Sequence, residues 1–413
     1  MDHVTVACIQ QRMSIQPTHE EFVAEARRFL RQAQAKGAHI AIFAELAGVM
    51  LAPPLISGFK LGFIKQKDQS KQPGAGFLSR TLGRVAGTTA GALGGGFRGS
   101  LERLLRKKGG AMYDAYADTF GGLAQEYGLV LVAGSVYIYD EETDTVRNRA
   151  YVFDVDGEVL GYQDKFNLAP NEITLASPGS DLTAIETRYG RFGLLIGRDA
   201  LYPELARGLA IQGVDLLVGL AASPGAGQAD VIRTALNVRA EENQLFAAAS
   251  FMLGHNHLGR GTEEDFYGRS ALMAPISLTP QGTGVLLEAG TNRTETIIAS
   301  QLDMEALAEL RESSRFRPRR EMHLGNLGPV LAEMYRDGLT IEEALAQRLG
   351  GPAEAAPGLG PGSVMEIEPS QATLAEPEEA VAMDTWQTQT PAIEAPEGLY
   401  ETGEGEEEQA DDG

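Results

Sequence analysis

Three segments of this 413-residue chain end an apolar run with polar or charged positions that could act together in catalysis. Glu45 follows the run 40–44, Lys165 and Glu172 lie seven residues apart, and Gly197-Arg198-Asp199 follows the run 192–196. The ends of sheet strands are where α/β proteins gather catalytic groups. A carboxylate can act as a general base, and a lysine can stabilise an oxyanion. Taken singly, Glu45 also reads as a surface acid, Lys165 as a solvated loop residue and Asp199 as a helix cap.

The elements that must position these residues alternate between strands and helices. Apolar runs with β-branched residues predict strands over 4–9, 39–43, 129–134, 150–154, 191–196 and 214–218. Helices are predicted over 203–212 and 229–244. Another helix is expected after Thr18, which has capping-box spacing to Glu21, and it should end near Gly37. This alternation predicts a layered α/β fold.

Several stretches, in order along residues 4–325, resemble the nitrilase or carbon–nitrogen hydrolase superfamily. They are Val6-Ala7-Cys8-Ile9-Gln10, residues 37–46, residues 148–165, Pro178-Gly179, residues 239–243, Gly268-Arg269-Ser270 and Arg319-Arg320. The resemblance implies a four-layer αββα sandwich, a triad of Glu, Lys and Cys, and a homodimer of αββα units. It implies that Glu45 and Lys165 stand at the catalytic Glu and Lys positions, and Glu172 at that of a second active-site Glu.

The nucleophile position departs from the family pattern. Where the pattern has cysteine followed by an aromatic residue and Asp, this chain has Gly197, Arg198 and Asp199. Glycine has no group that could attack a carbonyl or nitrile carbon, so a thioester route is closed. Cys8 lies inside the first predicted strand and is interpreted as a small buried hydrophobic residue. Arg198 and Asp199 are candidate binding residues, with Arg198 adding a second cation to the site.

Three functions remain open from the sequence. The first is a homologue that has lost hydrolysis and binds a small amide- or carboxylate-bearing molecule, or acts as a scaffold. The second is an active amidase or nitrilase in which Glu45 or Glu172 activates water beside Lys165. The third is a membrane-peripheral or partner-binding platform. A decayed site, kept only because its charges pair with one another, is the structural alternative to ligand binding.

Composition limits these functions further. The 43% hydrophobic and 22% charged content is that of a soluble globular protein, and no apolar run is long enough to span a bilayer. The first residues contain neither a basic leader nor an apolar stretch, which predicts a cytoplasmic location. No metal or cofactor is expected, because Cys8 is the single cysteine and His255 and His257 have no adjacent acidic or thiol ligand.

Two segments flank or interrupt the predicted domain of residues 1–325. The insertion 51–110 is rich in glycine, and eleven basic against two acidic residues lie between Lys60 and Lys108. Its leucines Leu101, Leu104 and Leu105 fall on one helical face, so the segment is predicted either to contact an anionic membrane or to cover a pocket. Few aromatic residues accompany this charge, so nucleic acid is not an expected partner. A helical extension is expected over 326–350.

Residues 351–413 form an acidic tail with sixteen Asp or Glu and no Lys or Arg. The tail has only isolated apolar residues and cannot offset an ordering cost of roughly 1–2 kcal/mol per residue, so it is predicted to be disordered.

Truncation after Gly351 is therefore expected to leave the melting temperature within a few degrees of that of the full chain. Differential scanning calorimetry of the two proteins checks this. A clear fall in melting temperature would mean that the tail contributes to the folded structure.

Overall fold

The computed structural model describes residues 3–56, 96–107, 109–259, 265–315, 317–321, 324–339 and 343. The chain divides into two units, residues 1–329 and 330–413, and of the second only 330–339 and 343 are described. The acidic tail and residues 57–95 of the predicted insertion lie outside the described residues. Helix α11 (Leu324–Asp337) covers the beginning of the predicted helical extension. All other elements belong to the first unit.

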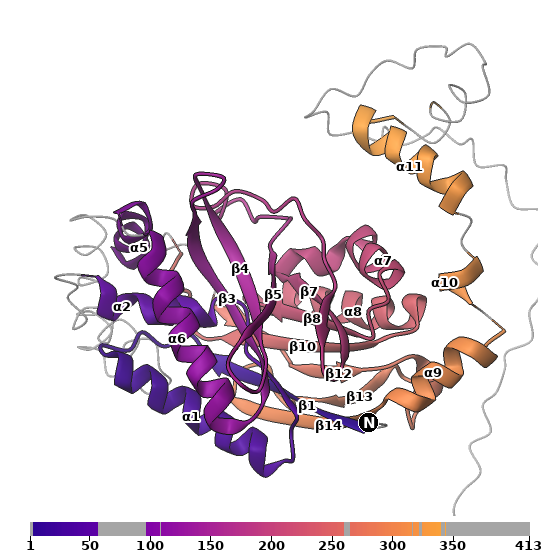
Figure 1. Cartoon of the computed structure of the whole chain (residues 1–413), viewed down its shortest axis with the longest axis horizontal. Helices are drawn as coiled ribbons and strands as arrows, with labels where there is room; N and C mark the ends of the chain where they lie inside the picture. The colour runs from indigo at the N-terminus through magenta and orange to yellow at the C-terminus, as the bar shows by residue number, and fades with distance from the viewer. Residues whose placement is uncertain are drawn as a thin grey trace, which may run out of the picture. The chain divides into compact units, whose positions relative to one another are not determined.

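Two sheets form the centre of the first unit (Figure 1). The first has the order β5-β4-β3-β2-β1-β14, and the second β6-β7-β8-β10-β12-β13. The first sheet contains β1 (His3–Arg12), β2 (Ile40–Ile42), β3 (Val130–Asp140), β4 (Thr145–Phe153), β5 (Val159–Asp164) and β14 (Thr296–Asp303). The second contains β6 (Ile185–Thr187), β7 (Gly190–Ile196), β8 (Leu216–Ala221), β10 (Phe246–Leu253), β12 (Ala271–Met273) and β13 (Val285–Glu288).

The two sheets meet where the end of β1 pairs in parallel with β10, at Gln11 with Met252 and Arg12 with Leu253. Away from this joint they face each other across a shared apolar core. Along β1, Val6 and Cys8 belong to this inner core, while Ala7 and Ile9 belong to the core under the helices. This period of two, with both faces apolar, is what a strand buried on both sides requires.

Helices cover the outer face of each sheet. The helices α1 (His19–Ala35) and α6 (Gly109–Tyr127) lie along the first sheet, and α7 (Pro203–Ile211) and α8 (Ala226–Asn243) along the second (Figure 1). Three separate apolar clusters, one between the sheets and one under each helix layer, complete four layers. The αββα fold predicted from the sequence is confirmed.

Helix α1 shows how local sequence produces one of these layers. Thr18 caps the helix by accepting a hydrogen bond from Glu21 N at 3.2 Å. The buried side chains recur every three or four residues, at Phe22, Ala26, Phe29, Leu30 and Ala33. The helix ends before Gly37, which has a φ of +71°. These are the boundaries that the sequence predicts.

The leucine face of the predicted insertion is buried in the domain. Leu101 and Leu105 are fully buried and Leu104 is 8% exposed, all three on α5 (Gly96–Lys107). This helix packs against β3 and α6. Burial of each leucine stabilises the fold by about 1.5–3 kcal/mol, so this face is not available to a bilayer. Membrane contact through the rest of 51–110 stays a prediction.

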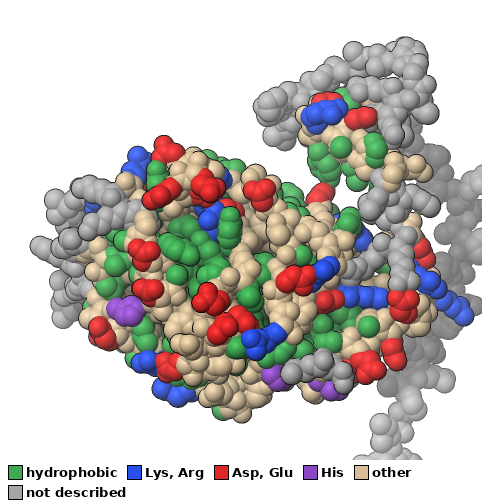
Figure 2. All heavy atoms as spheres, in the orientation of Figure 1, with side chains coloured by type: hydrophobic (Ala, Val, Ile, Leu, Met, Phe, Trp, Pro, Cys, Tyr) green, Lys and Arg blue, Asp and Glu red, His purple; other side chains and the backbone are tan. Residues whose placement is uncertain are grey.

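The remaining elements are short or peripheral. They are η1 (Ala47–Leu51), α2 (Ala52–Leu55), η2 (Gly197–Leu201), β9 (Ser223–Pro224), β11 (Phe266–Tyr267), η3 (Ile276–Leu278), α9 (Met304–Ser313) and α10 (Pro318–Glu321). Among the described helices, none has the length and apolar character that crossing a membrane requires. On the face shown in Figure 2, the coloured acidic and basic side chains are interspersed over the surface.

Candidate active-site pocket

Glu45 lies in a tight turn between β2 and η1. The next residue, Leu46, has a left-handed backbone with φ 66°, and its N–H donates to Ser135 Oγ at 2.9 Å. The turn packs so closely on β3 that a Cβ on Gly134 would lie 2.2 Å from the carbonyl oxygen of Ala44. Glycine at 134 is therefore required, and the backbone of β3 determines where Glu45 points.

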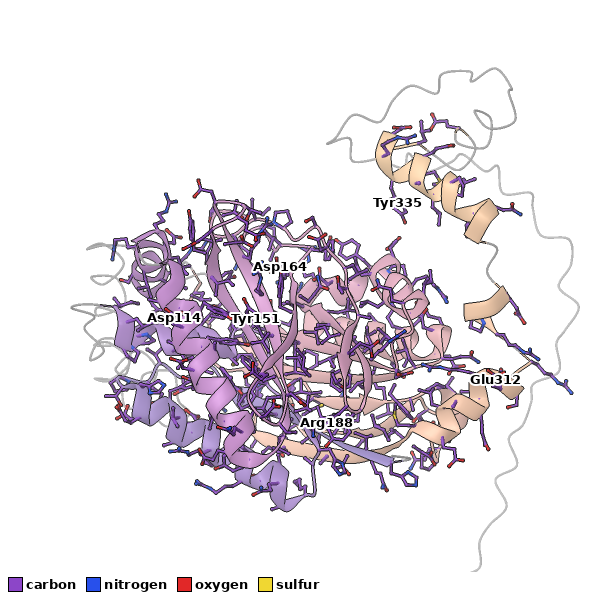
Figure 3. All side chains as sticks on the ribbon, viewed as in Figure 1. Asp114, Tyr151, Asp164, Arg188, Glu312 and Tyr335 are labelled. Atoms are coloured by element: carbon purple, nitrogen blue, oxygen red, sulfur yellow. The ribbon has the colours of Figure 1, made fainter. Side chains whose placement is uncertain are left out.

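Lys165 follows the last residue of β5. Its N–H donates to the carbonyl of Asn148 on β4 at 2.9 Å. Beside it, Arg149 donates to both carboxylate oxygens of Asp164, at 2.6 and 2.9 Å; Asp164 is labelled in Figure 3. This bidentate pair fixes the end of β5, from which the 4% exposed Lys165 enters the interior.

Lys165 joins the two glutamates in one buried cluster. Its Nζ lies 2.7 Å from Glu45 Oε1 and 2.6 Å from Glu172 Oε2. Asn148 Nδ2 lies between the same carboxylates, 3.3 Å from Glu45 Oε1 and 3.2 Å from Glu172 Oε1. Residues from three separate parts of the sequence are thus connected by hydrogen bonds. The sequence predicts such a grouping, because Glu45 and Lys165 each stand at the end of a strand.

Further donors hold each carboxylate. The N–H of Ala222, after β8, donates to Glu45 Oε2 at 2.8 Å. Glu172 accepts from Tyr137 OH at 2.9 Å and from the N–H of Ala169 at 2.7 Å. Every oxygen of both carboxylates therefore has a donor within the protein.

The two glutamates differ in how readily they take a proton. Burial raises the pKa of Glu45, although Lys165 and Ala222 oppose the shift. Burial also acts on Glu172, but the charge and hydrogen bonds of Lys165, with those of Ala169 and Tyr137, outweigh it and hold the pKa of Glu172 below its ordinary value. Burial opposes the charge of Lys165, yet the two carboxylates raise its pKa above normal. Of the two glutamates, Glu45 is therefore the one whose pKa is raised.

Gly197 lies beside the cluster of Glu45 and Lys165. It begins η2 at the end of β7 and has a φ of +57°. A Cβ at this position would lie 2.8 Å from Glu45 Oε2 and 3.0 Å from Lys165 Nζ. A side chain at 197 would thus point at the Glu45 carboxylate and the Lys165 ammonium.

The structure separates the roles of Arg198 and Asp199. Arg198 lines the cavity described below. Asp199 is 1% exposed and is not among the cavity-lining residues; it accepts hydrogen bonds from the N–H groups of Phe166 and Asn167, at 3.1 and 2.7 Å. Burial raises the pKa of Asp199, an effect that these donors oppose. These contacts tie η2 to the segment after Lys165, and a role of Asp199 in binding stays a prediction.

A cavity of about 280 Å³ opens at the cluster. Its wall includes Glu45, Lys165, Glu172 and Gly197. This volume lies just below the usual range for drug-sized ligands, so the cavity fits a small molecule.

Cys8 is remote from this cavity. It is fully buried between the two sheets, and burial raises the pKa of its thiol, so it is held in the unreactive protonated form. Among the described residues, no three His, Cys, Asp or Glu side chains are grouped as a metal site. His255 instead lies 3.0 Å, through Nδ1, from Asp265 Oδ1.

Sequence reasoning missed several residues of the pocket wall, among them Arg98 on α5, Tyr137 on β3 and Ser223 on β9. None belongs to a motif that carries chemistry. Tyr137 occupies an ordinary alternating position of a strand, and only its contact with Glu172 shows its role. Arg98 is one of several basic residues in the insertion, and the sequence does not distinguish it from the others.

A model of the carbon-nitrogen hydrolase family matches residues 5–312, and the match includes Glu45, Lys165, Glu172 and the segment around Gly197. The chain belongs to the carbon-nitrogen hydrolase family. The family resemblance of its sequence is thereby confirmed.

Relatives of this family member include amidases. It is 29% identical to omega-amidase NIT3 of Saccharomyces cerevisiae over 200 residues, which span 46% of this chain and 65% of the yeast protein. It is 30% identical to omega-amidase NIT2 of Mus musculus, over 53% of this chain and 73% of the mouse protein. The match thus extends over about two thirds of the length of these relatives.

Solved structures show the same fold. A carbon-nitrogen hydrolase from Helicobacter pylori superposes with a TM-score of 0.57 at 20% identity, over 80% of this chain and 98% of that chain. An amidase from Nesterenkonia sp., in complex with acrylamide, gives 0.54 at 18% identity, over 82% and 98%. Another structure of that amidase carries an acetamide moiety on its active-site cysteine.

Proposed function

We propose that this carbon-nitrogen hydrolase homologue binds a small amide- or carboxylate-bearing molecule without hydrolysing it. The observation that carries the proposal is Gly197, whose missing Cβ would lie within 3.0 Å of both Glu45 Oε2 and Lys165 Nζ. The Nesterenkonia amidase has a reactive cysteine in its active site. The single cysteine of this sequence, Cys8, is buried between the sheets and cannot replace such a group.

The cavity favours a ligand-binding site over a decayed site that is kept only because its charges pair with one another. The charges of Glu45, Lys165 and Glu172 satisfy one another, which the decayed-site interpretation also requires. A decayed site does not account for Arg198, which lines the cavity and makes no hydrogen bond or ion pair with a described residue. A homodimer, a cytoplasmic location and a scaffolding role stay predictions of the same proposal.

We expect the full-length protein to release no ammonia above the buffer background from a panel of short aliphatic amides and nitriles. Loss of a covalent nucleophile removes several orders of magnitude in rate, so the assay must exclude slow turnover as well. The check is an enzyme-coupled ammonia assay on the wild type and on Lys165→Met. Hydrolysis at ordinary enzymatic rates that disappears in Lys165→Met would instead establish a route in which Glu45 or Glu172 activates water.

A further inference from the structure

The cavity wall carries cationic donors that the cluster of Glu45, Lys165 and Glu172 does not use. They come from two elements far apart in sequence, Arg98 on α5 and Arg198 on η2. The charge of Lys165 is matched by two carboxylates at hydrogen-bond distance. Any further anion in the cavity therefore has to be attracted by the two arginines.

Arg98 is held in place by its own contacts. It is 7% exposed; its Nη2 donates to the carbonyl of Asn171 and to Thr174 Oγ1, both at 2.7 Å, and its Nε lies 3.1 Å from Glu102 Oε1. Among the described residues, none accepts a hydrogen bond from its Nη1. The guanidinium of Arg98 is thus buried, and two of its three nitrogens are anchored. Its remaining nitrogen is preorganised to bind an acceptor in the cavity that Arg98 lines.

Arg198 is the less satisfied of the two. No described residue forms an ion pair or hydrogen bond with it, and its Nε is buried without a partner. Nearby, the hydroxyl of Ser223 is also buried without a partner, on a residue that is only 2% exposed and lines the same cavity. Buried polar groups are rarely left in this state, because each costs about 1–3 kcal/mol when it has no partner.

We infer that the cavity recognises a small ligand through an anionic group, a carboxylate, bound by Arg98 and Arg198 with Ser223 as an additional donor. Lys165 is paired with the two glutamates and Arg98 with Glu102, so the cavity-wall cation without an ion pair to a described residue is Arg198. A carboxylate neutralises that charge and accepts several hydrogen bonds at once, whereas an amide carbonyl can only accept hydrogen bonds. This inference rests on the proposed binding function and specifies its ligand class.

Three probes of similar shape separate charge from size. Succinamic acid has one amide and one carboxylate, succinamide replaces the carboxylate by a second amide, and butyramide has no second polar group. We expect succinamic acid to bind the full-length protein at least about tenfold more tightly than succinamide, with butyramide weaker still. Isothermal titration calorimetry gives the three dissociation constants, and the preference for succinamic acid should decrease as salt is added.

Variants test the assignment of the residues. Arg198→Ala is expected to remove the preference for succinamic acid and to leave folding unchanged, because Arg198 has no described hydrogen bond to lose. Arg98→Lys keeps the charge but loses the planar fork, and should weaken succinamic acid binding about tenfold while butyramide binding is unaffected. Arg103→Ala, at an exposed position on the same helix, is the matched control and should bind as the wild type does.

Each outcome decides the inference. If succinamide binds as tightly as succinamic acid, or if Arg198→Ala retains the preference, the anion assignment is wrong while the binding function stands. Absence of succinamic acid binding at millimolar concentration also overturns it. If Arg98→Lys does not fold, as circular dichroism would show, Arg198→Ala alone gives the decision. Failure of the proposed function is seen separately, as ammonia release from amides.

Discussion

Replacement of Lys165 by methionine is expected to lower the free energy of unfolding by about 3–5 kcal/mol at neutral pH. Methionine fills much of the same volume but leaves Glu45 and Glu172 buried beside each other without a cation. Removing one partner of a buried ion pair costs more than the pair contributes, because the remaining charge stays out of water. Urea unfolding of the wild type and the variant measures the difference.

The same variant should regain stability as the pH falls. Without Lys165, burial and mutual repulsion raise the pKa of both glutamates in the folded state above their values in the unfolded chain. The folded state then binds more protons than the unfolded state, so stability increases as pH decreases from 7 to about 5. Lys36→Met, at an exposed position after α1, is the control and should show neither effect. A Lys165→Met protein as stable as the wild type at pH 7 would show that the cluster carries no net buried charge.

Introduction of a cysteine at Gly197 is expected to create a thiol that chloroacetamide alkylates roughly a hundredfold faster than an exposed thiol. The new side chain would point at Glu45 Oε2 and Lys165 Nζ, and Glu45 is the carboxylate that accepts a proton most readily. The experiment uses a Cys8→Ala background and intact-protein mass spectrometry. Gly227→Cys provides the exposed comparison, because nothing lies within 4 Å of a Cβ there.

The loss of folding stability caused by a side chain at position 197 limits this experiment. Gly197 has a left-handed backbone, which costs a residue with a Cβ about 1–2 kcal/mol, and Glu45 must move to admit the new atom. Gly197→Ala should thus be destabilised by about 2 kcal/mol, whereas Gly227→Ala should not be. Equal alkylation rates at positions 197 and 227, or an undiminished rate after Glu45→Gln, would contradict the assignment of Glu45 as the base.

The sequence allowed prediction of those parts that depend on local pattern. The cap at Thr18 and the spacing of apolar residues specify α1, and apolar runs ending in charged residues indicate where Glu45 and Lys165 emerge from the sheet. Their strands, β2 and β5, end at the same edge of one sheet, but β3 and β4 lie between them, so strand order alone does not bring the two side chains together.

What could not be predicted depends on contacts between distant segments. The leucine face of α5 is amphipathic in the sequence, but the pattern does not show whether its partner is a bilayer or β3. Arg98 reaches the pocket through Asn171 and Thr174, which are 73 and 76 residues away, and no motif encodes such a contact. Asp199 precedes a helix and could have been a cap or a ligand; only the fold shows that it accepts hydrogen bonds from Phe166 and Asn167.

The pairing of β1 with β14 has a consequence for synthesis of the chain. These strands pair antiparallel along most of their length, from His3 with Asp303 to Gln10 with Thr296. During translation, β1 therefore lacks this neighbour until almost 300 further residues have been made. Over that time its unpaired backbone groups form an open edge, the feature through which nascent chains associate wrongly. Closure of the sheet is thus a late event, and a ribosome stalled before Thr296 would hold a chain that chaperones must protect.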